Sequence, residues 1–131
     1  MLEQDQQNGK IILVVEDNEA NKKLLRLMLQ RVGHEVDTVS SGKEALTALE
    51  KKRYDLVFMD VTMPEMDGFE TTKQIRNSQT IQNKNLPVLA ITGHTSDEYK
   101  NKCFESGMND YIEKPYLLDD LQKVITKVFK N

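Results

Sequence analysis

The sequence lacks tryptophan, long apolar segments and any cysteine besides Cys103. A single cysteine excludes an internal disulfide, and we expect Cys103 to serve in packing rather than in redox chemistry. No apolar run approaches the ~18–20 residues that span a bilayer. The first nine residues also lack the basic and apolar regions of a signal peptide. We therefore predict a cytoplasmic location, with no membrane contact by this segment.

An excess of charge of one sign is also absent. The 18 basic and 21 acidic residues give a formal net charge of −3. This balance argues against direct nucleic-acid binding, which depends on clustered lysine and arginine. The two histidines, His34 and His94, have no partners at metal-ligand spacing. A structural or solvent-exposed role is the better interpretation for both.

The length of 131 residues fits one domain, because domains commonly contain ~100–150 residues. Residues 1–9 are polar and show no periodic pattern, so we predict an N-terminal tail or the stub of a linker. Residues 10–131 are predicted to form the domain.

Apolar runs alternate regularly with amphipathic segments along this domain. The run from Ile11 to Val15 is continuous, which is typical of a strand covered on both faces. Further strands are predicted at 35–39, 56–60, 87–92 and 110–113. Strands that alternate with helices predict a parallel sheet with helices on both faces. The expected fold class is α/β, a flavodoxin-like (βα)5 doubly wound five-stranded parallel sheet.

Helical spacing predicts a helix after each strand. The first covers 18–32 and ends at Gly33, and its apolar positions are Ala20, Leu24, Leu27, Met28 and Val32. The second begins with the capping box Ser41 to Glu44 and carries Ala45, Leu46 and Leu49. The third begins at an acidic N-cap, Asp67, and carries Phe69, Thr72 and Ile75. The fourth covers 96–106 before Gly107, and the fifth carries Leu118, Leu121, Ile125 and Val128.

Reactive side chains follow the strands at one end. They are Glu16 and Asp17 after the first strand, Asp60 and Thr92 at the ends of the third and fourth, and Lys114 after the fifth. Open α/β sheets place their ligand crevice outside the carboxyl ends of the strands, so we expect these side chains to converge. Three acids, a hydroxyl and an ammonium group at one edge suggest phosphoryl transfer to Asp60.

The carboxylates at this edge would repel one another unless a divalent cation neutralised them. Mg²⁺ takes oxygen ligands and typically combines one or two carboxylates with waters and a phosphate, and Mn²⁺ is a plausible substitute. We expect Asp17 and Asp60 to be direct ligands and Glu16 to hold a metal-bound water. The backbone carbonyl of Thr62 is a further expected ligand. The alternative for Glu16 and Asp17 is that they only stabilise the start of the following helix.

Lys114, Thr92 and Tyr111 complete the candidate site. A cis bond between Lys114 and Pro115 is one way to turn the lysine into the crevice, where its charge would screen a phosphoryl group. The Thr92 hydroxyl can donate to a phosphoryl oxygen, although β propensity alone would account for a threonine here. Tyr111 is either core packing or an aromatic switch that follows Thr92. The switch would alter the surface of the fourth helix, fifth strand and fifth helix.

The ordered set of motifs resembles the receiver domain of two-component response regulators, from about Lys10 to the C-terminus. The motifs are the acid pair Glu16-Asp17, Asp60 with Met63-Pro64 and Asp67-Gly68, Thr92, Tyr111, and Lys114-Pro115. The resemblance implies Mg²⁺-dependent transfer of phosphate to Asp60 from a histidine kinase or histidine phosphotransfer domain. It further implies a downstream output protein or domain, and self-catalysed phosphotransfer rather than stand-alone enzymatic turnover.

Further details of the resemblance concern the parent protein and the crevice. The segments 16–21 and 63–70 are similar to receivers attached to hybrid sensor histidine kinases. Thr62 and His94 occupy the two variable positions that flank the phosphoryl group in this family. Gly93 stands where alanine is frequent, which should leave the crevice open.

Three rival interpretations share parts of the pattern. A flavodoxin would offer a Ser/Thr/Gly-rich phosphate loop where this chain has the acidic segment 16–19. A Mg²⁺-dependent aspartyl-phosphate phosphatase of the haloacid dehalogenase type would carry a second acid two residues after Asp60, where Thr62 stands. An unphosphorylated protein-interaction module would usually have lost an acid or the lysine, and none is lost.

Overall fold

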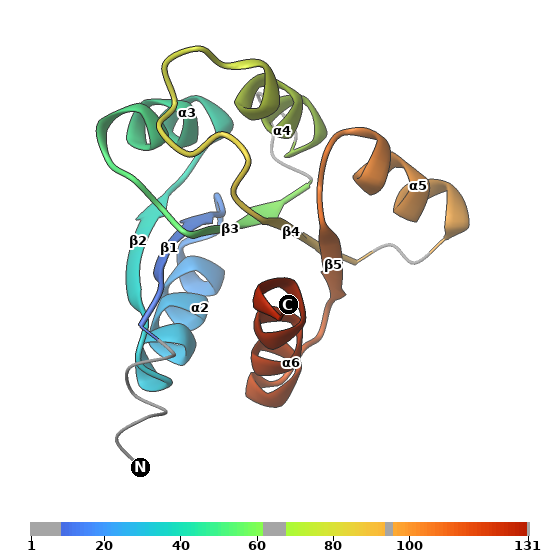
Figure 1. Ribbon diagram of the computed structural model, residues 1–131. Coiled ribbons are helices and arrows are strands. Elements are labelled where there is room, and N and C mark those ends of the chain that lie inside the picture. Colours follow the sequence, from blue (N-terminus) through green and yellow to red (C-terminus); the bar gives the residue numbers. More distant parts are fainter. Residues whose placement is uncertain (1–8, 62–67, 94–95, 131) are drawn as a thin grey trace.

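The computed structural model describes residues 9–61, 68–93 and 96–130 (Figure 1). Strands and helices alternate along that part of the chain. The elements are β1 (Ile11–Val15), α2 (Glu19–Arg31), β2 (Glu35–Val39), α3 (Gly42–Lys51), β3 (Leu56–Asp60), α4 (Gly68–Asn77), β4 (Val88–Thr92), α5 (Asp97–Glu105), β5 (Asp110–Glu113) and α6 (Leu118–Phe129).

The strands form one five-stranded parallel sheet in the order β2-β1-β3-β4-β5. This order confirms the predicted flavodoxin-like fold. The order reverses between β1 and β3, and open sheets bind ligands beyond the carboxyl ends of the strands at such a point. Asp60 pairs in register with Ile91, so the end of β3 lies beside the end of β4. The topology thus brings the predicted acids and Thr92 to one edge.

Two apolar layers cover the sheet, one on each face. Helices α2 and α6 lie on one side, and α3, α4 and α5 lie on the other (Figure 1). The first layer joins Leu25 and Leu29 of α2 to Leu121 and Ile125 of α6. Every residue of β3 and β4 is buried, which explains their unbroken apolar runs. Asp60 therefore ends a strand that is covered on both faces.

The apolar positions predicted for the first helix are partly wrong, although Met28 packs against the core. Leu25 and Leu29 are buried, whereas Leu24 and Leu27 are 55% and 50% exposed. The helix carries leucines on two adjacent sides. Helical spacing alone is therefore consistent with burial of either Leu25 and Leu29 or Leu24 and Leu27. Contact with the sheet selects the side that bears Leu25. Leu24 and Leu27 are left facing outward.

The helix ends follow the predicted chemistry with one difference. Ser41 Oγ accepts the Glu44 N–H at 3.1 Å, but the Glu44 carboxylate accepts the N–H of Ser40 rather than that of Ser41. Gly33 and Gly107 have φ of 100° and 105°, a left-handed conformation that glycine adopts without a steric penalty. The predicted N-cap Asp67 lies outside the described residues.

Arg76 ties the end of α4 to the loops that lead into β4 and β5. Its guanidinium donates to the carbonyls of Lys84, Leu86 and Gly107 and to Asn109 Oδ1, at 2.7–3.0 Å. Burial lowers the pKa of Arg76. A planar group with five donors suits this set of acceptors. One side chain thus fixes the starts of the two strands that carry Thr92 and Tyr111.

Cys103 has the packing role that we predicted, and His34 has a structural role, one of its two predicted alternatives. Cys103 is buried, and burial raises the pKa of its thiol. His34 is also buried, and its Nδ1 accepts the backbone N–H of Lys10 at 3.2 Å. His94 lies outside the described residues. Among the helices that the structure describes, none combines the length and apolar character needed to cross a membrane.

Candidate phosphoryl-transfer site

Three carboxylates meet at the carboxyl edge of the sheet. Glu16 and Asp17 follow β1, and Asp60 ends β3. One carboxylate oxygen from each lies within 4.8 Å of the others. Glu16 and Asp60 are only 2% and 3% exposed, whereas Asp17 is open to solvent. The cluster therefore has a buried floor and one exposed acid at its rim.

The pKa of Glu16 reflects both its burial and the neighbouring acid. The pKa of Glu16 is raised from its ordinary 4.5 to about 7, mainly by burial and further by the nearby charge of Asp60. A hydrogen bond from the Asn18 N–H and the charge of Lys114 oppose this rise. That bond joins Asn18 N to Glu16 Oε2 at 3.1 Å. A cation bound to the cluster would offset both effects, because opposite charge favours the ionised carboxylate.

The N-cap of α2 is Asn18, not one of the preceding acids. Asn18 Oδ1 accepts the N–H of Asn21 at 2.9 Å. The helix terminus thus has its own polar cap, and Glu19 supplies an acid in its first turn. Capping alone does not explain Glu16 and Asp17.

Lys114 enters the same cluster from the end of β5. Its Nζ lies 3.9 Å from Asp60 Oδ2. The Lys114 N–H donates to the Thr92 carbonyl at 2.8 Å, which holds the ends of β4 and β5 together. The Lys114–Pro115 bond is cis, the arrangement that the sequence suggested. The ammonium group and the buried aspartate are therefore neighbours.

The other predicted site residues fall into three groups. Thr92 is 3% exposed at the end of β4, beside the strand that ends with Asp60. Tyr111 lies on β5 opposite Ala90, and its ring contacts α5 rather than the carboxylates. Thr62 lies outside the described residues, so its expected carbonyl ligand stays a prediction.

Two neighbours of the cluster were assigned no role from the sequence: Gly68, which was placed only in a motif, and Tyr116. A Cβ on Gly68 would lie 2.7 Å from the Asp60 carbonyl oxygen and 2.9 Å from Val61 Cα, so α4 starts directly against the end of β3. The half-buried Tyr116 has its pKa raised by burial and by the charges of Glu16 and Asp60. The only signals in the sequence were the glycine after Asp67 and the tyrosine two residues after Lys114.

A flavodoxin-like sheet with clustered acids, a threonine and a lysine at its carboxyl edge defines the receiver class of signalling domains. The family model for the response regulator receiver domain matches residues 12–126. The chain belongs to this family and is a receiver domain of a two-component system.

The relatives of known sequence include proteins named as histidine kinases and sensor proteins. Hybrid signal transduction histidine kinase L of Dictyostelium discoideum is 40% identical over 98% of this chain and 8% of its own length. The sensor protein GacS of Pseudomonas syringae pv. syringae is 39% identical over 88% of this chain and 13% of its own length. The chain thus spans only a small part of these relatives.

Solved receiver structures superpose closely on this fold. The receiver domain of sensor histidine kinase PA1611 from Pseudomonas aeruginosa PAO1 has a TM-score of 0.82 and 34% identity, covering 91% of this chain and 96% of that one. That structure has a magnesium ion coordinated in its active site cleft. Chemotaxis protein CheY4 of Vibrio cholerae has a TM-score of 0.86 and 34% identity, covering 92% and 99%.

Proposed function

We propose that this receiver domain accepts a phosphoryl group on Asp60 in a Mg²⁺-dependent phosphorelay. The observation that supports it is the placement of Asp60 within 4.8 Å of two other acids and 3.9 Å from the Lys114 ammonium group. A lone buried aspartate would be a poor phosphate acceptor, because two anions repel. Here the Lys114 ammonium group, and a cation held by the acids, would screen that repulsion.

The residues present fit a hard divalent cation. Asp17 and Asp60 would hold it directly, Glu16 would hold a water bound to it, and the Thr62 carbonyl belongs to the same proposal. Carboxylate oxygens are the ligands that Mg²⁺ prefers, and Mn²⁺ shares that preference. Burial and the nearby charge of Asp60 raise the pKa of Glu16, and a bound cation would favour its ionised form. When bound, the cation would screen the charge of the incoming phosphoryl group.

In the proposed step, an Asp60 carboxylate oxygen attacks the phosphorus of a phosphohistidine. The O–P bond forms as the N–P bond breaks, and the imidazole leaves with the electron pair and takes up a proton. Lys114 contributes positive charge beside the phosphoryl oxygens, and the Thr92 hydroxyl donates to one of them. Attack by water on the acyl phosphate later regenerates the Asp60 carboxylate and releases phosphate.

The proposed donor is a histidine kinase or a histidine phosphotransfer domain in the cytoplasm. Relatives that are named as histidine kinases support this class of partner. The proposed output surface is formed by α5, β5 and α6, where Tyr111 would respond to Thr92, and a downstream protein or domain would bind it. The net charge of −3 gives no support to a nucleic-acid partner.

The test is labelling with acetyl phosphate and Mg²⁺, followed by borohydride trapping and mass spectrometry. We expect one label, on Asp60, and none in Asp60→Asn. Asp119→Asn is the matched control, because Asp119 is an exposed acid on α6. Equal labelling of Asp60→Asn would sink the proposal.

The same assay separates the rival functions. Steady release of phosphate from p-nitrophenyl phosphate would identify a phosphatase, whereas stoichiometric labelling supports a receiver. A chain that takes no label from either a small donor or a phosphorylated histidine phosphotransfer domain would be an interaction module.

The metal ligands are tested with Asp17→Ala. We expect Mg²⁺ affinity and labelling rate to fall together, because a ligand and part of the charge screening are lost. Asp97→Ala is the control, since Asp97 is also an exposed acid near a helix N-terminus but lies outside the cluster. Unchanged Mg²⁺ affinity in Asp17→Ala would show that Asp17 is not a metal ligand and only stabilises the start of the helix.

A further inference from the structure

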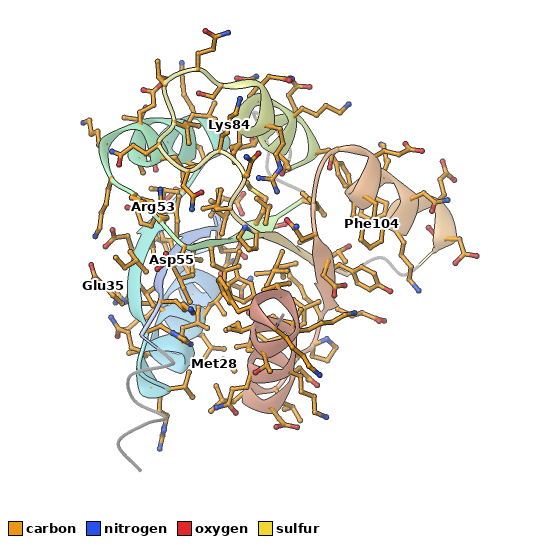
Figure 2. All side chains as sticks on the ribbon, viewed as in Figure 1. Met28, Glu35, Arg53, Asp55, Lys84 and Phe104 are labelled. Atoms are coloured by element: carbon orange, nitrogen blue, oxygen red, sulfur yellow. The ribbon has the colours of Figure 1, made fainter. Side chains whose placement is uncertain are left out.

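Phe104 is an aromatic residue on α5 that stays half exposed (Figure 2). Its ring lies against Tyr111 of β5, with ring centroids 6.4 Å apart and an interplanar angle of 71°. This is the edge-to-face arrangement in which the positive edge of one ring meets the negative face of the other. Phe104 is only partly buried, yet it lies where it contacts Tyr111, the candidate switch.

Lys100 contacts the same tyrosine from one helical turn earlier. Residues four apart share a helix face, so Lys100 and Phe104 approach Tyr111 together. Lys100 Nζ lies 5.4 Å from the centre of the Tyr111 ring, within the range of a cation–π contact. The Tyr111 side chain is also the largest cause of the raised pKa of Lys100.

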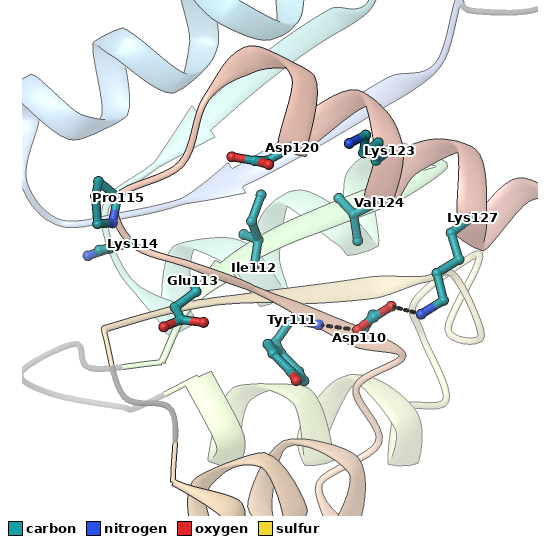
Figure 3. Close-up of a pocket in the computed structure, with 10 residues that line it drawn as sticks. All are labelled: Asp110, Tyr111, Ile112, Glu113, Lys114, Pro115, Asp120, Lys123, Val124 and Lys127. Carbon is teal, nitrogen blue, oxygen red and sulfur yellow. Dashed lines mark hydrogen bonds and ion pairs between the residues drawn. The ribbon is translucent and has the colours of Figure 1, made fainter.

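The backbone around Tyr111 is held at both ends. Asp110 is paired with Lys127 of α6 at 3.0 Å and accepts the Tyr111 N–H at 2.8 Å (Figure 3). At the other end, the Lys114 N–H bonds to the Thr92 carbonyl. Figure 3 shows the Tyr111 side chain pointing away from α6. Movement of Tyr111 between two positions would therefore be a movement of the side chain.

We propose that Phe104 and Lys100 are positioning residues that form a latch, holding the Tyr111 ring against α5 in the resting protein. This inference rests on the proposed function, in which phosphorylation draws Thr92 toward Asp60 and Tyr111 turns inward. Both contacts must break before the ring can leave α5. The latch thereby stabilises the resting form and weakens the coupling between the phosphoryl site and the output surface.

The experiment measures the affinity for beryllofluoride, a phosphoryl mimic, in the presence of Mg²⁺. Phe104→Ala and Lys100→Ala are each expected to bind roughly threefold more tightly, because each removes one contact that only the resting form makes. Lys100→Arg keeps the cation and is expected to restore the original affinity. Asn101→Ala is the control, since Asn101 is exposed on the same helix and should leave the affinity unchanged.

Two further readouts separate a latch from a purely structural effect. In the free variants, the NMR signals of the Tyr111 ring should shift toward their positions in the beryllofluoride-saturated protein. In a Tyr111→Ala background, Phe104→Ala should have no effect on affinity. Unchanged affinity and ring shifts in both alanine variants would overturn the latch and leave the proposed function standing. A failure of the unsubstituted protein to bind beryllofluoride would overturn both.

Discussion

Lys114 Nζ lies 3.9 Å from Asp60 Oδ2, about 1 Å longer than the ~2.7–2.9 Å of a close ammonium–carboxylate hydrogen bond. The ammonium group is near enough to be attracted and far enough away to leave room for another oxygen. The lysine is partly exposed and the aspartate is buried, so the flexible partner is the one that can adjust. This spacing suits a lysine that contacts a phosphoryl oxygen on Asp60.

Lys114→Ala should therefore impair phosphorylation without impairing metal binding. We expect labelling by acetyl phosphate to slow by about a hundredfold, the usual scale for losing one charge-stabilising donor. Mg²⁺ affinity should stay the same or rise, since a positive charge is removed from beside the cluster. Lys123→Ala, an exposed lysine of α6, is the control. Weaker Mg²⁺ binding in Lys114→Ala would show that the lysine supports the acids rather than the phosphate.

Glu16→Gln should stabilise the metal-free protein at alkaline pH. The pKa of Glu16 rises from 4.5 to about 7 on folding, so the folded state holds the proton more tightly. The contribution of Glu16 to stability is therefore largest below pH 4.5 and falls as the pH rises toward 7. Glutamine avoids this loss. We therefore expect the free energy of unfolding of Glu16→Gln to exceed that of the unsubstituted protein by about 2 kcal/mol at pH 8, and the difference to disappear near pH 4.

Urea unfolding in EDTA at the two pH values measures this gain. Glu105→Gln, at an exposed position on α5, should show no such difference. Added Mg²⁺ should stabilise the unsubstituted protein more than Glu16→Gln. A variant that is no more stable at pH 8 than at pH 4, relative to the unsubstituted protein, would show that Glu16 is not electrostatically strained.

Much of the fold and site could be read from the sequence, because burial on both faces leaves a continuous apolar run. The bounds of β1, β2, β3 and β5 agree with the prediction, and β4 begins at Val88 rather than Pro87. A proline has no N–H to donate to a neighbouring strand. The convergence of Glu16, Asp17 and Asp60 followed from parallel topology alone, since equivalent ends of parallel strands share one edge.

The sequence could not predict contacts that depend on tertiary packing. The leucines of α2 permit two buried faces by spacing, and only the sheet decides between Leu25 and Leu24. Arg76 resembles any helical surface arginine until the loops that accept its hydrogen bonds are in place. The meeting of Phe104 with Tyr111 depends on how α5 lies along β5, which no local pattern encodes.

The contact between Gly68 and β3 predicts a sharp difference between two Gly→Ala changes. Gly68→Ala places a methyl group 2.7 Å from the Asp60 carbonyl oxygen. Backbone atoms must then move, and we expect a loss of about 1–3 kcal/mol in unfolding free energy, although alanine normally favours a helix. Mg²⁺ affinity should fall too, because the displaced atoms belong to Asp60, which we propose as a metal ligand.

Gly93→Ala is the matched control for that change. A Cβ there meets no atom of the described residues within 4 Å, and surface substitutions of this kind usually change stability by less than ~0.5 kcal/mol. Urea unfolding and Mg²⁺ titration of the two variants measure the contrast. Equal stability of both variants would show that α4 can move away from β3 without cost.

The last prediction concerns Asp37, at the opposite edge of the sheet from Tyr111. Its Oδ2 accepts the Tyr54 hydroxyl at 2.7 Å and the Lys52 ammonium at 2.9 Å. The Tyr54 hydrogen bond is the largest cause that lowers the pKa of Asp37 below its ordinary 3.8. A carboxyl with a depressed pKa stabilises the fold above its unfolded value, and the contribution is lost as pH falls through the folded value.

Tyr54→Phe should therefore cost stability in a pH-dependent way. We expect a loss of about 1 kcal/mol near neutral pH, because the charged acceptor loses its donor while the buried ring is kept. The loss should shrink well below pH 3.8, where Asp37 is protonated in both states. Urea unfolding of Tyr54→Phe across this range, with and without Asp37→Asn, isolates the pair. If Tyr54→Phe costs as much in the Asp37→Asn background as alone, the hydroxyl stabilises the fold through some group other than Asp37.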